Sequence, residues 1–326
     1  MKAIVVHRED KIPELVWETV EDVSYKAEEV LVAVKASAVN RADLSQAAGN
    51  YPPPPGVTDI LGLEMAGVIL EKGEKVRGWQ VGDRVCALLG GGGYAEQVAV
   101  HQDMLMRLPE AWSFAQGTAV PEVWLTAFVN LFIEGGLQSG ETVLVHAGGS
   151  GVGTAAIQLA REAGATSFTT AGAEEKLAAC RELGAALAIN YKEEDFLERV
   201  QAATNGKGVD LILDPVGANY LERNLMALKP NGRMVLIGLM SGAKTELNLG
   251  LVLGKSLRII GSRLRSRPLT EKIAITRQFQ SRFWSLMENG MIMPVVDTVF
   301  PIAQAQQAHQ YVRENRNTGK VILEVG

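Results

Sequence analysis

The fold is decided by the stretch Val143-Leu144-Val145-His146-Ala147-Gly148-Gly149-Ser150-Gly151-Val152-Gly153. An apolar strand enters a glycine-rich turn, and a helix with an apolar stripe leaves it. The turn fits the G-x-G-x-x-G pattern, except that serine stands at the second glycine position. The glycines of such a turn let backbone N–H groups approach a phosphate. The helix N-terminus adds partial positive charge. The residues predicted to bind a dinucleotide are therefore Gly148, Ser150, Gly151, Val152 and Gly153; the alternative is a helix packed closely on a strand.

Short apolar runs alternate with helical segments from Leu125 onward, at intervals of about 20 to 25 residues, as in the βα units of a parallel sheet. Strands are predicted at residues 142–146, 167–171, 187–190, 209–214, 233–239 and 257–262. Six such strands indicate a doubly wound parallel sheet, that is, a Rossmann cofactor domain.

The two ends of the chain have a different pattern. Residues 2–6, 30–36 and 94–100 are predicted strands. Helices are predicted around 270–288 and 301–313, and a closing strand at 320–324 rejoins the first region. We therefore expect an α/β protein with a β-rich domain over residues 1–124, the cofactor domain over 125–264 and a return segment over 265–326.

Composition excludes several classes of protein. The 326 residues suffice for roughly two domains. With 47% hydrophobic and 21% charged residues, the chain is neither disordered, collagenous nor membrane-embedded. Its net charge of -5 gives no general attraction for nucleic acid or an anionic membrane.

Cysteine usage indicates a reducing compartment. Cys86 and Cys180 form no CxxC motif, which disfavours both a disulfide framework and a structural zinc site. The first apolar run is too short for a signal peptide, and the uncharged stretch 142–160 contains four glycines, which suits no bilayer span. We expect a cytoplasmic protein.

The end of the second Rossmann strand predicts which nucleotide binds. An NAD site carries a carboxylate there, whereas this chain has Ala171-Gly172-Ala173 followed by Lys176. A small residue leaves room for a 2′-phosphate and a lysine supplies charge, so NADPH is favoured over NADH. Glu174 and Glu175 leave an alternative open: they either face solvent in an acidic first turn or restore ribose binding.

Tyr51 is the residue expected to face substrate. It lies in the loop Gly49–Gly56, whose four consecutive prolines stiffen the backbone. Its phenol can stack on a planar acceptor and donate a proton; packing within the loop is the alternative. The chain's four histidines are scattered, which gives little support to a histidine-based site.

The glycine turn, together with Asn40-Arg41-Ala42-Asp43, Gly62-Leu63-Glu64-Met65-Ala66-Gly67 and Gly82-Asp83-Arg84-Val85, resembles the medium-chain dehydrogenase/reductase superfamily. Within it the chain is similar to the zinc-free, zeta-crystallin-like quinone oxidoreductases, and among these to the tumour-suppressor-inducible type. The resemblance covers nearly the whole chain. It implies a GroES-like β-barrel catalytic domain built from the two chain ends, an active site in the cleft beside the Rossmann domain, and a homodimer or homotetramer.

Two departures from the superfamily pattern concern zinc. Leu63 stands where the alcohol dehydrogenases have a histidine ligand, and Asn40 where they have a cysteine ligand. Neither is a plausible zinc ligand, so no metal is expected. Without a Lewis acid, hydride transfer to an electrophilic acceptor remains the feasible chemistry.

The resemblance also implies individual contacts. Those to the adenosine phosphate are Gly172, Lys176, Tyr191 and Arg316. Those near the nicotinamide and its ribose are Asn40, Thr126, Gly238, Leu239 and Leu264. Asn40 and Tyr51 are the expected catalytic residues. The alternatives are a turn asparagine at 40, a helix threonine at 126 and a packed ring at 191.

These observations predict an NADPH-dependent oxidoreductase that reduces a quinone. One alternative is an enoyl or enone reductase. Another is a weakly active NADPH-binding protein with a structural or RNA-binding role, against which the acidic balance argues.

Overall fold

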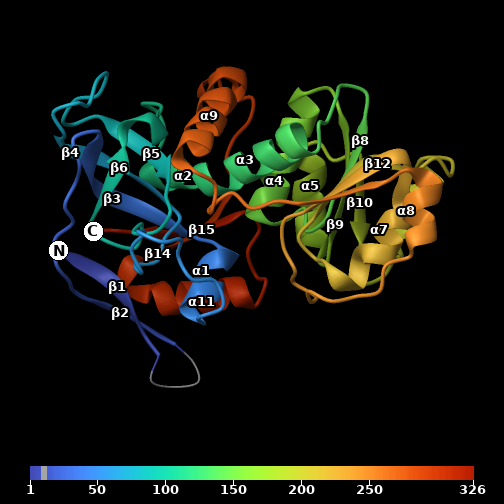
Figure 1. The fold of residues 1–326 in the computed structure, drawn as a ribbon, viewed down its shortest axis with the longest axis horizontal. Coiled ribbons are helices and arrows are strands. Elements are labelled where there is room, and N and C mark those ends of the chain that lie inside the picture. The colour runs from blue at the N-terminus through green and yellow to red at the C-terminus, as the bar shows by residue number, and fades with distance from the viewer. Residues whose placement is uncertain (9–12) are drawn as a thin grey trace. The chain divides into compact units, whose positions relative to one another are not determined.

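The computed structural model describes residues 1–8 and 13–326. The chain divides into two compact units, one of Met1–Leu125 with Arg265–Gly326 and one of Thr126–Leu264. Each unit is built around its own large sheet (Figure 1).

The second unit contains a six-stranded sheet, counted over the described residues, in the order β10-β9-β8-β11-β12-β13. Every neighbouring pair in it is parallel. The strands are β8 (Thr142–Val145), β9 (Thr166–Ala171), β10 (Leu187–Asn190), β11 (Val209–Asp214), β12 (Leu228–Leu236) and β13 (Arg258–Gly261). The predicted Rossmann fold is confirmed, and its strand order reverses between β8 and β11, where such sheets bind ligands.

Helices flank this sheet, as Figure 1 shows for α4, α5 and α7. They are α4 (Gly151–Glu162), α5 (Glu174–Glu182), α6 (Phe196–Ala203), α7 (Leu221–Ala227) and α8 (Leu249–Lys255). Because both faces are covered, the strands are apolar on both sides, and Leu144, Ile212 and Met234 pack with Phe196 in one core. The predicted strand 233–239 starts earlier, at Leu228, and ends at Leu236, which pairs with Asp214, the last residue of β11.

The first unit contains a mainly antiparallel sheet in the order β14-β15-β3-β4-β5-β7, with β6 also paired to β3 and a separate hairpin of β1 and β2. The strands are β1 (Lys2–His7), β2 (Glu14–Thr19), β3 (Glu29–Val39), β4 (Glu64–Lys72), β5 (Arg84–Leu88), β6 (Gln97–His101), β7 (Leu105–Arg107), β14 (Val296–Pro301) and β15 (Lys320–Glu324). The long strand β3 pairs with β4, β6 and β15, and so holds the barrel together.

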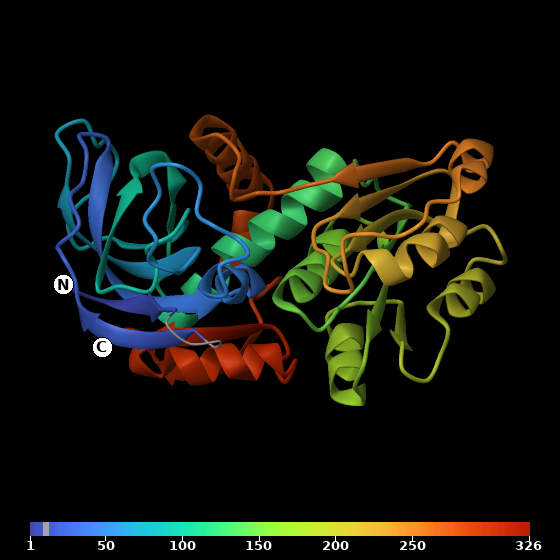
Figure 2. The ribbon, with the colours of Figure 1, turned by 60° about the horizontal axis from the view of Figure 1, so that its bottom comes forward.

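The return segment completes this first unit. Its strand β15 runs antiparallel to β3, with Val321 opposite Val39. The helices of the unit's two parts are α1 (Arg41–Ala47), α2 (Phe114–Thr118), α9 (Leu269–Phe279), α10 (Ser285–Glu288) and α11 (Ala305–Arg313). The helix α3 (Pro121–Phe128) begins in this unit and ends in the second one. Figure 2 shows α11 alongside the β1–β2 hairpin. A π-helical turn at 280–284 joins α9 to α10, which together cover the single helix predicted at 270–288.

Two smaller expectations can be compared directly with the structure. Cys86 and Cys180 are both buried free thiols. Among the described residues, no helix has the length and apolar character that crossing a bilayer requires.

Candidate functional site

The turn between β8 and α4 leaves no room for side chains. A Cβ on Gly148 would lie 1.8 Å from Thr169 Oγ1, and a Cβ on Gly153 would lie 2.5 Å from the carbonyl oxygens of Ala147 and Gly148. Ala147 itself has a positive φ of 56°. The glycines are therefore fixed by close packing of the turn on the sheet and on itself.

Ser150 is the N-cap of α4, since its Oγ accepts the N–H of Gly153 at 3.0 Å. The first N–H groups of a helix have no partner within it, and this cap uses one of them. The N–H groups of Gly151 and Val152 stay at the positive end of a 12-residue helix, where an anion is stabilised. The serine in the glycine pattern thus completes the helix start, while the turn keeps its capacity for phosphate.

Beside the turn, three of the predicted phosphate contacts lie at the carboxyl edge of the sheet. The aliphatic stem of Lys176 packs on Gly149, whose Cβ would meet it at 3.0 Å. The Tyr191 hydroxyl lies against Gly172, 2.6 Å from where a Cβ would stand. One further cation lies here that was not predicted from the sequence: Lys192, whose Cε would be 3.0 Å from the same Cβ. Its signal was its place directly after Tyr191.

The acidic pair before Lys176 is exposed. Glu174 forms an ion pair with Arg181 at 2.6 Å on the outer face of α5. Glu175 is likewise exposed. This arrangement favours the solvent-facing alternative for both carboxylates.

A buried hydrogen-bond chain lies under the turn. His146 Nε2 is 2.7 Å from Asn224 Oδ1, and its Nδ1 is 3.1 Å from Thr170 Oγ1. The Asn224 amide nitrogen donates to Asp214 at 3.1 Å, so its oxygen faces the histidine and Nε2 carries the proton. Burial lowers the pKa of His146 to about 4 and raises that of Asp214 to about 6. This chain of hydrogen bonds connects the ends of β8, β9 and β11 to α7.

The remaining predicted contacts of this unit lie in its loops and in α3. Gly238 follows β12 and packs against Pro215, and Leu239 beside it is exposed. Thr126 is half-buried in α3, with its carbonyl accepting from Asn130 at 2.7 Å. Leu264 is buried after β13.

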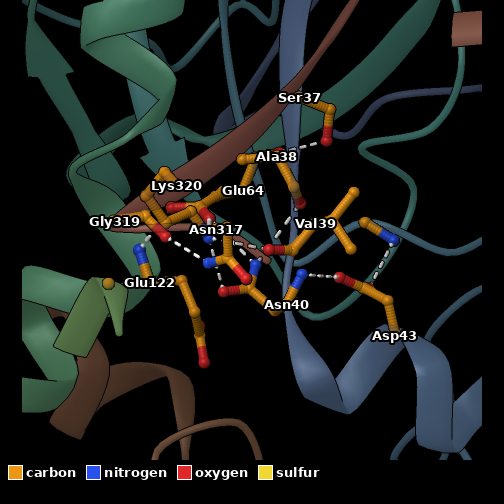
Figure 3. Close-up of polar contacts among 12 residues, drawn as sticks. Ser37, Ala38, Val39, Asn40, Asp43, Glu64, Glu122, Asn317, Gly319 and Lys320 are labelled. Atoms are coloured by element: carbon orange, nitrogen blue, oxygen red, sulfur yellow. Dashed lines mark hydrogen bonds and ion pairs between the residues drawn. The ribbon is translucent and has the colours of Figure 1, made fainter. Parts of the chain in front are cut away.

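The first unit holds a buried polar cluster that Figure 3 shows around Asn40, Glu64 and Lys320. The Lys320 ammonium lies 2.7 Å from Glu64 Oε1 and 2.7 Å from Asn40 Oδ1, and it donates to the Val39 carbonyl at 3.1 Å. The Asn40 amide nitrogen donates to Glu64 Oε1 at 2.9 Å. Both ends of the Asn40 amide are thus engaged within the protein.

The cluster extends to two further acids. Glu64 Oε2 accepts the backbone N–H of Glu122 at 2.8 Å. Asp43 accepts the backbone N–H of Asn40 at 2.8 Å and that of Gly62 at 3.1 Å. Burial raises the pKa of Asp43 to about 6 and, with the nearby charge of Glu64, that of Glu122 to about 8.

The donor set of this cluster does not fit zinc. Leu63 is buried and has no donor atom, and the Asn40 and Glu64 oxygens hold the Lys320 ammonium. Within residues 1–8 and 13–326, no three His, Cys, Asp or Glu side chains are grouped as a metal site would need. No role was predicted for Glu64 or Lys320 from the sequence, because the two residues are far apart along the chain and only the fold brings them together.

Tyr51 lies on an arginine. Its ring centroid is 5.2 Å from Arg265 Cζ, in the same unit. Arg265 is 4% exposed as a residue, and its guanidinium donates from Nε to the Gly90 carbonyl and from Nη2 to Gln46 Oε1, both at 2.7 Å. No role for Arg265 was predicted from the sequence.

Arg316, the fourth predicted phosphate contact, follows α11. Its guanidinium lies over the Tyr311 ring, 4.5 Å from the centroid, and 3.8 Å from a Glu314 carboxylate oxygen. Within the first unit, the Arg316 side chain therefore contacts the end of α11 at the protein surface.

Comparisons with known proteins agree with this architecture. Two family models match: "Alcohol dehydrogenase GroES-like domain" over residues 26–110 and "Zinc-binding dehydrogenase" over residues 151–280. The quinone oxidoreductase of Mus musculus is 33% identical over 302 residues, which cover 91% of this chain and 89% of that protein. The name of the second family model implies a zinc ion, and the donor set of the buried cluster around Lys320 does not fit one.

Solved structures are similar over the full length. The quinone oxidoreductase of Escherichia coli, complexed with NADPH, matches with a TM-score of 0.89 and 31% identity, covering 99% of this chain and 100% of that one. An NAD-dependent alcohol dehydrogenase matches with a TM-score of 0.88 and 32% identity, covering 100% of both chains. Proteins with either nucleotide in their description therefore share this fold.

Proposed function

This chain belongs to the quinone oxidoreductase family of the medium-chain dehydrogenase/reductase superfamily and is an oxidoreductase, and from that premise we propose that it reduces quinones with NADPH. The observation that carries the proposal is the carboxyl edge of the Rossmann sheet. There the glycine turn, a helix N-terminus, Lys176 and Tyr191 lie together, and no carboxylate ends the second strand.

The residues at this edge fit NADPH. Gly148 to Gly153 would hold the pyrophosphate, because the turn admits no side chain and the helix start stabilises an anion. Lys176 and Tyr191 would hold the 2′-phosphate beside Gly172, and we add Lys192 to them. For the nicotinamide half we propose Asn40, Thr126, Gly238, Leu239 and Leu264, and for the phosphate also Arg316. When bound, NADPH supplies a hydride.

The acceptor side follows from the first unit. The Lys320 ammonium occupies the donors that a metal would use, so the protein offers no Lewis acid there to activate an alcohol. A quinone is already electrophilic and needs orientation rather than activation. We assign its orientation to Tyr51, whose ring is held over Arg265.

The test is steady-state oxidation of NADPH and of NADH with a panel of ortho- and para-quinones, enones and enoyl thioesters. We expect NADPH with a quinone to give the highest kcat/KM. Faster turnover of enoyl thioesters would make the protein an enoyl reductase instead. Tight NADPH binding without turnover of any acceptor would favour a binding role.

We also propose a cytoplasmic homodimer. Two buried free thiols suit a reducing compartment. Strand β13 is an edge of the Rossmann sheet and carries Ile259 and Ile260, and α8, which directly precedes it in the chain, exposes Leu249 at 70% and Leu253 at 83%. An antiparallel pair of β13 strands about a two-fold axis would satisfy this edge and cover the leucines. Light scattering should give a dimer for the wild type and a monomer for Ile259→Lys.

A further inference from the structure

Arg265 has a buried donor with nothing to bind. It lies in the loop between β13 and α9, and two of its nitrogens donate to Gly90 and Gln46. Its third nitrogen, Nη1, is buried and has no hydrogen-bond partner among the residues that the structure describes. A desolvated N–H of a charged group without an acceptor is costly, and native proteins rarely keep one without a function.

The guanidinium is held in a fixed orientation. Gln46 uses its amide nitrogen on the Asp59 carbonyl at 3.0 Å, which turns its oxygen towards Arg265. The Gly90 carbonyl holds Nε, and the Tyr51 ring covers the group. Nη1 is therefore presented next to Tyr51 by contacts made before any ligand arrives, which is the preorganisation that stabilises developing charge.

The surrounding charges leave this point positive. Lys272 is near, with Nζ 3.5 Å from the Arg265 carbonyl. Of the two acids that interact with Arg265, Asp43 accepts the backbone N–H groups of Asn40 and Gly62 in the buried cluster. Glu122 has a buried Oε2 with no partner in the described chain, and its pKa is raised to about 8, so it is mainly neutral at pH 7. Arg265 and Lys272 thus bring two positive charges to this point, against the single ionised carboxylate of Asp43, which already accepts two backbone N–H groups.

We propose that Arg265 Nη1 binds the acceptor oxygen that becomes negatively charged during reduction, with Tyr51 stacked beside the acceptor ring. This inference rests on the proposed function. When the acceptor gains a hydride, its conjugated π electrons shift and one carbonyl oxygen takes the negative charge. The product is a hydroquinone monoanion or an enolate, which afterwards takes one proton from the Tyr51 hydroxyl, and water then returns a proton to Tyr51. A charge-assisted hydrogen bond from a guanidinium is the interaction that grows as this charge develops.

The first experiment measures binding without cofactor or turnover. 4-Nitrophenol absorbs visible light as its phenolate, so spectrophotometric titration reports both its affinity and its pKa on the protein. Wild type is expected to lower the pKa of bound 4-nitrophenol, and Arg265→Gln to weaken phenolate binding by about 10-fold. Arg267→Gln is the matched control, because Arg267 lies in the same loop and pairs with Glu271 at 3.5 Å. It should bind like wild type.

The second experiment measures quinone reduction. Arg265→Gln is expected to lower kcat by about 100-fold, the usual loss for one donor to an oxyanion, while NADPH affinity is unchanged. Arg265→Lys should recover part of kcat, since lysine keeps the positive charge but lacks the planar guanidinium with its fixed set of N–H donors. Thermal melting identifies any variant that fails to fold.

The outcomes separate the two proposals. An unshifted pKa of 4-nitrophenol on the wild type overturns the role of Arg265, whether or not the variants fold. A normal kcat in Arg265→Gln overturns it too, and leaves the proposed function intact. Failure of the wild type to reduce any acceptor overturns the proposed function alone, while a phenolate pKa shift that depends on Arg265 would still establish the anion site.

Discussion

The Lys320 ammonium lies 2.7 Å from Glu64 Oε1, and both side chains are buried. Lys320 comes from β15 and Glu64 from the start of β4, and both strands flank β3. Asn40, which follows β3, bonds to both partners. One ion pair therefore fixes the ends of three strands, one of them from the return segment.

Replacing Lys320 by methionine should be severely destabilising. It leaves the Glu64 carboxylate buried without its cation, which costs about 3–5 kcal/mol of unfolding free energy. Urea denaturation measures the loss. Lys75→Met is the control, because Lys75 pairs with Glu28 at the surface and should change stability by less than about 1 kcal/mol. Similar losses in the two variants would contradict the importance of the buried pair.

A second stability prediction concerns pH and His146. Its pKa of about 4 in the folded protein lies below the ordinary histidine value of 6.5, so the unfolded chain binds a proton at higher pH than the folded protein does. The contribution of neutral His146 to the free energy of unfolding is therefore complete above pH 6.5. It is lost as pH falls from 6.5 to about 4, by roughly 1.4 kcal/mol per pKa unit.

The measurement compares wild type with His146→Gln over this pH range. Asp43 and Asp214 have raised pKa values, so their own pH dependence has the opposite sign, and the difference between the two proteins removes it. The stability advantage of wild type should shrink as the solution is acidified. A constant difference would mean that His146 is not buried in its neutral form.

The nucleotide preference should depend on Lys176. Lys176→Ala is expected to weaken NADPH by about 10-fold and NADH little, because the lost interaction is a charge-assisted bond to the 2′-phosphate. Lys192→Ala should act in the same direction. Fluorescence titration with both nucleotides measures each affinity, with the exposed Lys207→Ala as control. Equal losses for the two nucleotides would place the phosphate elsewhere.

These predictions separate what local sequence encodes from what it does not. The strand, turn and helix around Gly148 follow from apolar periodicity and glycine spacing, and the parallel sheet follows from their repetition. The contacts of Lys320 with Glu64 and of Arg265 with Gly90 join residues far apart in the chain. No local pattern marks such pairs, and a buried lysine or arginine looks like any surface cation until the fold places it.

The glycine turn should tolerate no side chain at Gly148. Gly148→Ala would put a Cβ 1.8 Å from Thr169 Oγ1 and 2.9 Å from Cys180 Sγ, so β9 or the turn must move. We expect loss of NADPH binding, measured by fluorescence, with a lowered melting temperature. Gly148→Ala with Thr169→Ala should recover part of both, since the nearest atom is gone. Gly254→Ala, with open space in α8, should be neutral or stabilising.

Tyr51→Phe tests the phenol separately from the ring. The phenylalanine ring can still cover the Arg265 guanidinium, so NADPH affinity and 4-nitrophenol binding should change little. If the hydroxyl donates a proton or hydrogen bond to the acceptor, kcat should fall by about 100-fold, the lower end for general acid catalysis. Tyr25→Phe is the control, because that hydroxyl bonds to Glu71 on the surface. An unchanged kcat in Tyr51→Phe would leave Arg265 as the group that acts on the acceptor oxygen, and would reduce Tyr51 to a stacking surface.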